Sequence, residues 1–184
     1  MRGKSHLCLG AYLVKHYMEN IPMRYIKAFQ FGCIEPDHNP ITYLKGSFRC
    51  QWLRGHNYCN ARHFMNRVAI RLENRTKLNL YDYYSLGKLI HYTTDAFTYA
   101  HNSHFPAALC YHRQYEKALQ DYFLEFLAQE PKADTMNFHS IMDVICSYHR
   151  DYEQTESNIH NDSRFALSAC CCVLANLFIK PIVL

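Results

Sequence analysis

The chain has 184 residues, enough to bury the core of one domain, and we expect a single domain over residues 1–184. Its formal net charge of +4 is far below that of a typical nucleic-acid-binding domain, so no nucleic-acid partner is expected. Nine cysteines without a Cys-x-x-Cys pair exclude a cysteine-rich zinc site and a paired disulfide framework, which leaves reduced thiols as the simplest interpretation.

Two apolar stretches lie near the ends of the chain. Residues 7–14 follow a basic start, but no small-x-small cleavage site comes after them, so we expect the first helix of the fold and not a signal peptide. Residues 165–184 are interrupted by Asn176 and Lys180 before they reach a spanning length of ~20 apolar residues. We expect a buried closing helix there, with a membrane anchor as the alternative, and a cytoplasmic protein whose membrane contact is peripheral.

Apolar residues recur at helical spacing along most of the chain and predict six helices. The expected helices cover about residues 7–20, 61–72, 80–101, 109–129 and 138–152, and the C-terminal stretch from residue 165 onwards. Asn79 is the expected N-terminal cap of the third helix. No stretch alternates convincingly with a period of two, so the expected class is all-α.

Between the first two helices, residues 31–56 predict a long irregular connection. They contain glycine or proline at five positions, namely Gly32, Pro36, Pro40, Gly46 and Gly55. A connection of this length inside a compact domain is usually functional or disordered.

Two histidine–carboxylate pairs, His91 with Asp95 and His112 with Glu116, are spaced by four residues. On a helix such residues are only ~40° apart, so their side chains reach the same point. Imidazole and carboxylate are both ligands that zinc accepts. His101 comes ten residues after His91, roughly 80° away around an ideal helix, so we expect it to serve a different ion or to lie where the helix ends. The spacing predicts at least two metal positions.

Spacing alone does not establish a metal site, because the chain repeats it elsewhere. His139 with Asp143 and His149 with Glu153 have the same separation. There the apolar residues of the helix define a different face, and charged neighbours crowd the pairs. We expect these to be solvated side-chain couples worth a few tenths of a kcal/mol.

The surroundings of His91 are less polar. Between Leu86 and His101 the only formal charges are Lys88 and Asp95, so the helix is expected to be enclosed on most sides. A buried carboxylate is costly unless it is paired with a cation or a metal. The residues by themselves leave two interpretations open, a metal site and a buried His–Asp hydrogen bond.

Residues 86–102, followed by the pair His112 and Glu116, resemble the bacterial zinc-dependent phospholipase C family. The family signature is H-x3-D-x5-H followed by H-x3-E. Upstream, Ser5-His6, residues 31–37 and residues 55–57 stand in the order of the family's other motifs, so the resemblance covers roughly residues 5–116. It implies a multi-helix bundle of the zinc-dependent phospholipase C type and a zinc-dependent phosphodiester hydrolase.

The resemblance also implies eight metal ligands, all His, Asp or Glu, in three zinc positions: Asp37, His56, His91 and Asp95 for the first, His101, His112 and Glu116 for the second, and His6 with the shared Asp95 for the third. Secreted members complete the third position with the amino and carbonyl groups of their processed N-terminal residue. This sequence shows no processing site, so we expect two zinc ions and leave the third open.

Bound zinc lowers the pKa of water from about 15.7 to about 7, which gives a hydroxide at neutral pH. The resemblance therefore implies hydrolysis of phospholipid to diacylglycerol and a phosphorylated head group, with Asp37 as ligand, general base or both in turn. Tyr43, Phe48 and Trp52 lie between Asp37 and His56. They are expected to line a head-group or lipid pocket, for instance by cation–π contact with choline, or else to pack the connection onto the bundle.

Two alternative functions stay open. One is another zinc phosphodiesterase on the same scaffold, such as the related fungal single-strand nucleases. The other is a metal-binding, membrane-associated module without catalysis. The weak positive charge counts against nucleic acid as substrate, and eight candidate ligands count against a structural site, which is normally closed by four. The sequence predicts neither a head-group preference nor an oligomeric state.

Overall fold

The computed structural model describes residues 1–39, 41, 58–102, 105, 109–133 and 139–179, and over these residues the chain is helical without any strand. The all-α prediction is confirmed. In chain order the helices are α1 (Gly3–Tyr17), α2 (Met23–His38), α3 (Tyr58–Glu73), α4 (Leu80–Ala96), the short 3₁₀ helix η2 (Tyr99–His101), α5 (Leu109–Ala128), α6 (Ile141–Glu153) and α7 (Ile159–Phe178).

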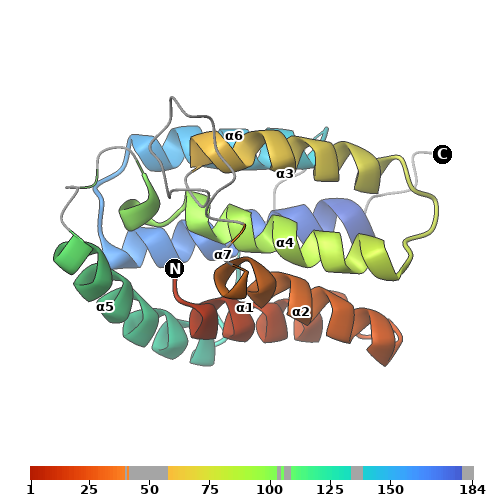
Figure 1. The fold of residues 1–184 in the computed structure, drawn as a ribbon, viewed down its shortest axis with the longest axis horizontal. Coiled ribbons are helices and arrows are strands. Elements are labelled where there is room, and N and C mark those ends of the chain that lie inside the picture. The colour runs from red at the N-terminus through yellow and green to blue at the C-terminus, as the bar shows by residue number, and fades with distance from the viewer. Residues whose placement is uncertain (40, 42–57, 103–104, 106–108, 134–138, 180–184) are drawn as a thin grey trace.

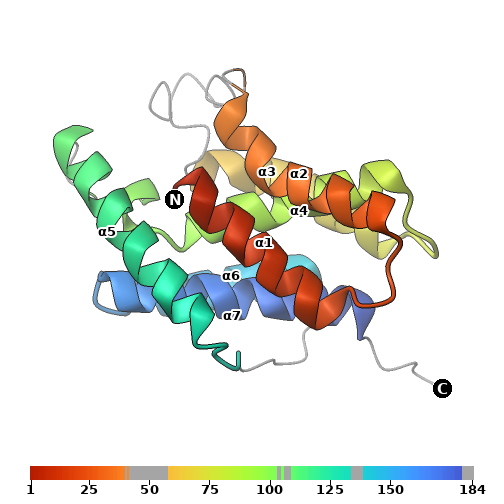
Figure 2. The same ribbon diagram turned by 90° about the horizontal axis from the view of Figure 1, so that it is seen from below.

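Helix α4 runs through the middle of the bundle (Figure 1). In this view α3 and α6 lie above it and α1 and α2 below it, while α5 crosses the end of the bundle where the N-terminus lies. Seen from below, α1 and α5 lie side by side at that end of the bundle (Figure 2). Every residue of α4 from Ser85 to Ala96 is buried, so the predicted enclosure of the helix around His91 is confirmed.

A capping box fixes the start of α4. The Asn79 side chain accepts a hydrogen bond from the backbone N–H of Asp82, and the Asp82 carboxylate accepts one from the N–H of Asn79. Two N–H groups that a helix start leaves unpaired are thereby satisfied. The predicted cap at Asn79 is confirmed, and it sets the register that puts His91 and Asp95 at the far end of the helix.

The other end of α4 is closed by a side chain from beyond it. The Asn102 amide donates to the carbonyl oxygens of Ala96 and Thr98, 3.1 and 2.9 Å away. The helix therefore ends at Ala96, and His101 arrives on the separate turn η2. Of the two placements expected for His101, the structure shows the one beyond the end of the helix.

The predicted irregular connection is wrong over its first eight residues, because α2 continues to His38. Gly32 and Pro36, which we took for helix breakers, lie inside α2. A Cβ atom on Gly32 would lie 2.1 Å from the carbonyl oxygen of Tyr84, so this glycine permits close contact between α2 and α4 and does not mark a turn. Asp37 consequently stands in the last turn of a helix.

The C-terminal stretch forms α7, whose residues are mostly buried against α4, α5 and α6. The predicted closing helix is confirmed. The cysteine run 170–172 lies in this buried face, and the cysteines that the structure describes are all free thiols, as predicted. Within the described residues no helix is both long enough and apolar enough to cross a membrane.

Candidate metal centre

Six of the predicted ligands gather at the end of the bundle where α1, α4, η2 and α5 meet. They form two groups, and within each group one ligand atom per residue lies within 4.8 Å of the others. The first group is buried, and the second is only partly buried. The members are His6, His91 and Asp95 in the first group and His101, His112 and Glu116 in the second.

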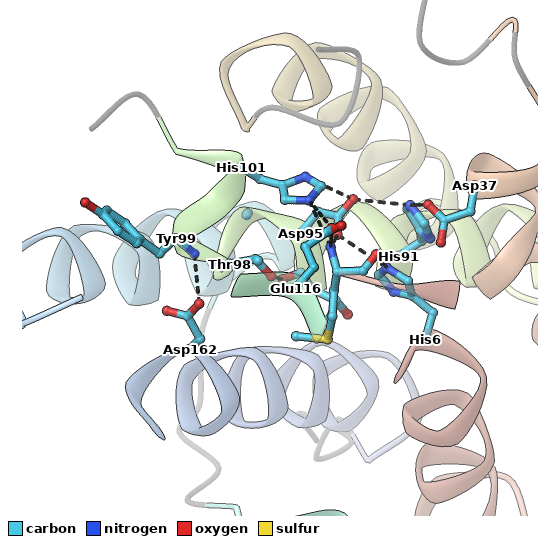
Figure 3. A network of polar contacts seen from close by, with 12 residues as sticks. His6, Asp37, His91, Asp95, Thr98, Tyr99, His101, Glu116 and Asp162 are labelled. Atoms are coloured by element: carbon cyan, nitrogen blue, oxygen red, sulfur yellow. Dashed lines mark hydrogen bonds and ion pairs between the residues drawn. The ribbon is translucent and has the colours of Figure 1, made fainter. Parts of the chain in front are cut away.

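Asp95 lies between the two groups (Figure 3). Its Oδ1 atom is 3.3 Å from Nε2 of His6, and its Oδ2 atom is 3.3 Å from Nε2 of His91 and 3.5 Å from Nδ1 of His101. The two oxygens of one carboxylate thus face different imidazoles. A carboxylate shared between two metal ions has this arrangement.

The tautomer of His91 is set by a backbone contact. Its Nδ1 atom lies 2.9 Å from the carbonyl oxygen of Cys33, which can only accept, so Nδ1 carries the proton and donates. In the neutral ring the lone pair on Nε2 then faces the carboxylate oxygens of Asp95, at 3.3 Å, and Asp37, at 3.7 Å. With a neutral ring, a cation between Nε2 and these carboxylates satisfies all three acceptors. A backbone carbonyl on the outer nitrogen is also how proteins orient metal-binding histidines.

The second group is built around Glu116. Its Oε1 atom is 3.1 Å from Nε2 of His101 and 3.6 Å from Nε2 of His112. The His112 side chain is 31% exposed, whereas that of Asp95 has no exposed surface. The second group therefore opens toward solvent.

The ammonium group of Met1 lies among these side chains. It is 2.6 Å from Oδ1 of Asp95, 2.9 Å from Nε2 of His101 and 3.3 Å from Oε1 of Glu116. Burial by itself would lower the pKa of this ammonium, but the carboxylates of Asp95, Glu116 and Asp37 outweigh it and raise the pKa to about 10. The point where the two groups meet thus favours a positive charge.

The charge states also suit a metal. Burial would raise the pKa of Asp95, but the neighbouring His101 and the Met1 ammonium hold it well below its usual range. Burial would also raise the pKa of Glu116, but hydrogen bonds from His101 and His112 outweigh this effect and lower the pKa. Burial, with repulsion from His91 as a smaller cause, lowers the pKa of His6 to about 4. At neutral pH the carboxylates are ionised and His6 is a neutral imidazole.

These residues fit zinc in chemistry and in spacing. Ligand atoms held at about 2.0–2.1 Å from a tetrahedral zinc are roughly 3.3 Å apart, and the contacts above run from 3.1 to 3.7 Å. Nε2 of His6 also lies 3.2 Å from the carbonyl oxygen of Met1, whereas its Nδ1 atom is buried and has no hydrogen-bond partner among the described residues, so His6 keeps one ring nitrogen without a partner.

A carboxylate that the sequence analysis missed supports the second group. Asp162 of α7 is buried and accepts hydrogen bonds from the backbone N–H of Tyr99 (2.8 Å, Figure 3) and from the hydroxyls of Tyr115 (2.8 Å) and Tyr152 (2.6 Å). Tyr99 begins the turn that carries His101, and Tyr115 directly precedes Glu116. Burial, moderated by these hydrogen bonds, raises the pKa of Asp162 to about 6. Asp162 stands in the polar first turn of α7, beside Asn161, Ser163 and Arg164, so the sequence carried no distinctive signal for it.

Of the two further histidine–carboxylate pairs with a spacing of four residues, His139 with Asp143 and His149 with Glu153, one histidine lies elsewhere than predicted. His149 is buried, its ring stacked 3.7 Å from that of Tyr58, and its Nε2 atom is 3.3 Å from Oδ1 of Asn102. The expectation of a solvated couple is wrong for His149, because it lies on the edge of the apolar face of α6. His139 and Asp143 are exposed, as predicted.

Four residues singled out from the sequence lie outside the described residues, namely His56, Tyr43, Phe48 and Trp52. Their roles stay predictions.

Comparison with known proteins gives one positive result. A family model described as zinc dependent phospholipase C matches residues 5–171 of the chain. No curated protein and no solved structure gives a significant match. The matched stretch includes both groups of candidate ligands and Asp162.

Proposed function

Because the chain belongs to the zinc-dependent phospholipase C family, we propose that it hydrolyses phospholipid to diacylglycerol and a phosphorylated head group. The observation that carries the proposal is the convergence of six His, Asp and Glu side chains from four separate elements. A structural zinc site is normally closed by four ligands. Here one group is sealed in the bundle and the other keeps an exposed side, which favours catalysis over a purely structural role.

We assign the ligands to zinc positions in the pattern that the family resemblance implies: Asp37, His91 and Asp95 with His56 as the expected fourth ligand, then His101, His112 and Glu116, and finally His6, which shares Asp95 with a third position. In the structure His6 lies in one group with His91 and Asp95, so the separate third position belongs to the proposal alone. Two ions are required by the proposal, and the third position is additional. When bound, zinc lowers the pKa of a coordinated water and draws negative charge from the phosphate oxygens.

The two carboxylates nearest to His91 take different roles because their surroundings differ. The Asp95 side chain has no exposed surface, so as the ligand shared by two zinc positions it contributes charge and holds the imidazoles in place, without contact with bulk water. The Asp37 side chain is 18% exposed and lies at the end of α2, so water can reach it. We assign to Asp37 the acceptance of a proton from the attacking water, alone or in alternation with a ligand role. The exposed edge at His112 and Glu116 receives the phosphate.

The test compares two identical substitutions at identically spaced pairs. In Asp95→Asn the changed carboxylate stands four residues after His91, and in Asp143→Asn it stands four residues after His139 on the exposed face of α6. Each variant is assayed for bound zinc and for release of diacylglycerol from a soluble short-chain phosphatidylcholine. We expect Asp95→Asn to lose about 100-fold or more in activity and to bind less zinc, since even indirect partners of metal ligands contribute 10- to 100-fold.

Three results would contradict the proposal. Asp95→Asn and Asp143→Asn could behave alike, which would remove the metal centre from the reaction. The zinc-replete protein could cleave oligonucleotides and leave phosphatidylcholine intact, which would favour a nuclease on the same scaffold. It could also bind zinc and cleave neither substrate, as a metal-binding module would.

A further inference from the structure

The positive charge of the chain is concentrated on α3 and the turn that follows it. Residues 58–77 contain five basic residues and one acidic residue, a net charge of +4, and this equals the formal net charge of the whole chain. The positive and negative charges of all other residues cancel. The basic residues are Arg62, Arg67, Arg71, Arg75 and Lys77.

Arg67 and Arg71, four residues apart, lie on the outer face of α3, and Arg75 is exposed in the turn that follows. Arg62 is instead turned toward α6, where it donates to Sγ of Cys146. The single acid, Glu73, is also turned toward α6 and accepts a hydrogen bond from the backbone N–H of Ile141. The outer face of the helix therefore presents arginines and no carboxylate of its own.

One acidic residue of α4 compensates part of this charge. Asp82 lies 3.3 Å from Nε of Arg71 and 3.9 Å from Nε of Arg75. Arg67 forms no ion pair within the part of the chain that the structure describes. The face keeps a surplus of positive charge after these pairs are formed.

Apolar side chains are exposed beside the arginines. Ile70 is 51% exposed on α3, and Leu80 and Tyr81 are 52% and 61% exposed at the start of α4. The guanidinium of Arg71 lies 4.6 Å from the centre of the Tyr81 ring. Basic residues interleaved with exposed aliphatic and aromatic side chains are typical of surfaces that lie on a lipid interface. Nucleic acid would use the arginines and leave Ile70 and Leu80 unexplained.

A groove of about 480 Å³ lies between α3 and α4 on this side. Its lining includes Arg67, Arg71, Tyr84 and Lys88. Tyr84 and Lys88 lie on the same face of α4 as His91 and Asp95, because the separations of four, three and four residues keep to one side of a helix. At 1.5 Å per residue, Lys88 precedes His91 by roughly 5 Å along the axis. The groove thus lies on the side of α4 that carries the metal ligands, and its lining ends about one turn before His91.

We propose that the outer face of α3, with the groove beside it, docks on an anionic phospholipid surface. The arginines contact the phosphates of the surface, and Ile70 and Tyr81 enter the boundary between head groups and acyl chains. The proposal rests on the proposed function in taking phospholipid as the partner. Docking is nevertheless a separate property, since binding is measured without turnover.

The test is sedimentation of the zinc-loaded chain with vesicles of phosphatidylcholine, with and without phosphatidylglycerol. It uses brief incubation on ice, after which the lipid is analysed to confirm that it is intact. The variant is Arg67→Glu/Ile70→Ser. The matched control is Lys27→Glu/Met23→Ser on α2, which also reverses one positive charge and removes one apolar side chain, at two exposed residues on a helix on the other side of α4 (Figure 1).

We expect the wild type to bind the anionic vesicles, and to bind them less tightly at high salt. One basic residue near an anionic surface contributes about fivefold in affinity, so replacing an attraction by a repulsion weakens binding roughly 25-fold in the α3 variant. The control keeps wild-type binding. Circular dichroism and thermal midpoints confirm that both variants are folded.

The proposal is wrong if the α3 variant binds as tightly as the wild type, if the control loses as much, or if the wild type binds oligonucleotides and no vesicle. Hydrolysis of soluble short-chain phosphatidylcholine separates this failure from failure of the proposed function. Lost docking with retained hydrolysis in the α3 variant supports the docking face. Vesicle binding by a wild type that hydrolyses nothing overturns only the catalytic proposal.

Discussion

Asp95 has no exposed surface, yet its carboxylate lies within 3.5 Å of a nitrogen of each of three imidazoles, on His6, His91 and His101. The sequence left two interpretations of this residue open. A neutral His91 cannot donate to Asp95, because the proton on its other nitrogen is donated to the carbonyl of Cys33. With a neutral His91, the geometry therefore favours a cation between its Nε2 atom and Asp95 over a buried His–Asp hydrogen bond, which needs a protonated ring.

Asp162 provides a prediction at the same scale. Its pKa is about 6 in the folded protein and ~3.9 in an unfolded chain, so its contribution to stability is fully present below pH ~4 and is lost as the pH rises through about 6. Asp162→Asn removes this dependence. Between pH 7 and pH 4, the free energy of unfolding of the wild type should rise relative to that of the variant by up to about 3 kcal/mol.

Urea unfolding of both metal-free proteins at several pH values measures this difference. A difference that stays constant between pH 4 and pH 7 would show that Asp162 titrates normally. It would also argue against the buried network with Tyr99, Tyr115 and Tyr152.

At the scale of elements, the crossing of α2 and α4 positions the first ligand group. It is the most extensive contact between two helices among the described residues. Gly32 and Gly87 face each other there, and a Cβ atom on either would come within 2.1 Å of a backbone oxygen of the opposite helix. This close approach places the carbonyl of Cys33 on His91 and brings Asp37 beside it.

Gly32→Ala should therefore destabilise the protein even though alanine favours helix. We expect a loss of about 2 kcal/mol or more, because overpacking against backbone costs roughly 1–3 kcal/mol and the helices must separate. For a chain of this length the thermal midpoint falls by about 4–8 °C. Gly10→Ala is the control, since its new Cβ atom meets the thiol of Cys33 at 3.3 Å, where a side chain can give way. Equal midpoints for the two variants would contradict the packing argument.

Some helices and helix ends could be predicted from the sequence, and others could not. Periodicity and caps are local, so the helix that begins after Asn79 follows from the sequence. Taken alone, Gly32 indicates a break in a helix. The structure shows that a glycine is needed there for close contact with Gly87 on α4, which no local pattern reveals. The helix α2 was therefore not predicted.

The residues of the candidate site were also predictable to different degrees. Spacing of four residues identifies His91 with Asp95, and the order of family motifs adds His6 and Asp37. Asp162 was missed because its partners lie on other elements, 47 and 63 residues earlier for Tyr115 and Tyr99. No spacing rule within one helix can pair residues so far apart.

At the scale of the whole molecule, zinc would connect elements that are distant in the chain. The two groups draw on α1, α4, η2 and α5, and Asp37 adds α2. Two buried histidines and a buried carboxylate are costly to assemble without a cation, so we expect metal binding and folding to be coupled. A ligand that binds only the folded state stabilises it by about 2.7 kcal/mol at a concentration 100 times its dissociation constant. The thermal midpoint should rise as zinc is added.

The most direct measurement is therefore a zinc titration of the metal-free protein, with bound zinc, thermal midpoint and hydrolysis of a short-chain phosphatidylcholine recorded on the same samples. We predict no hydrolysis without zinc, a rising midpoint as zinc binds, and full activity only when at least two zinc ions are bound per chain. Full hydrolysis by protein that carries less than one zinc per chain would contradict the account.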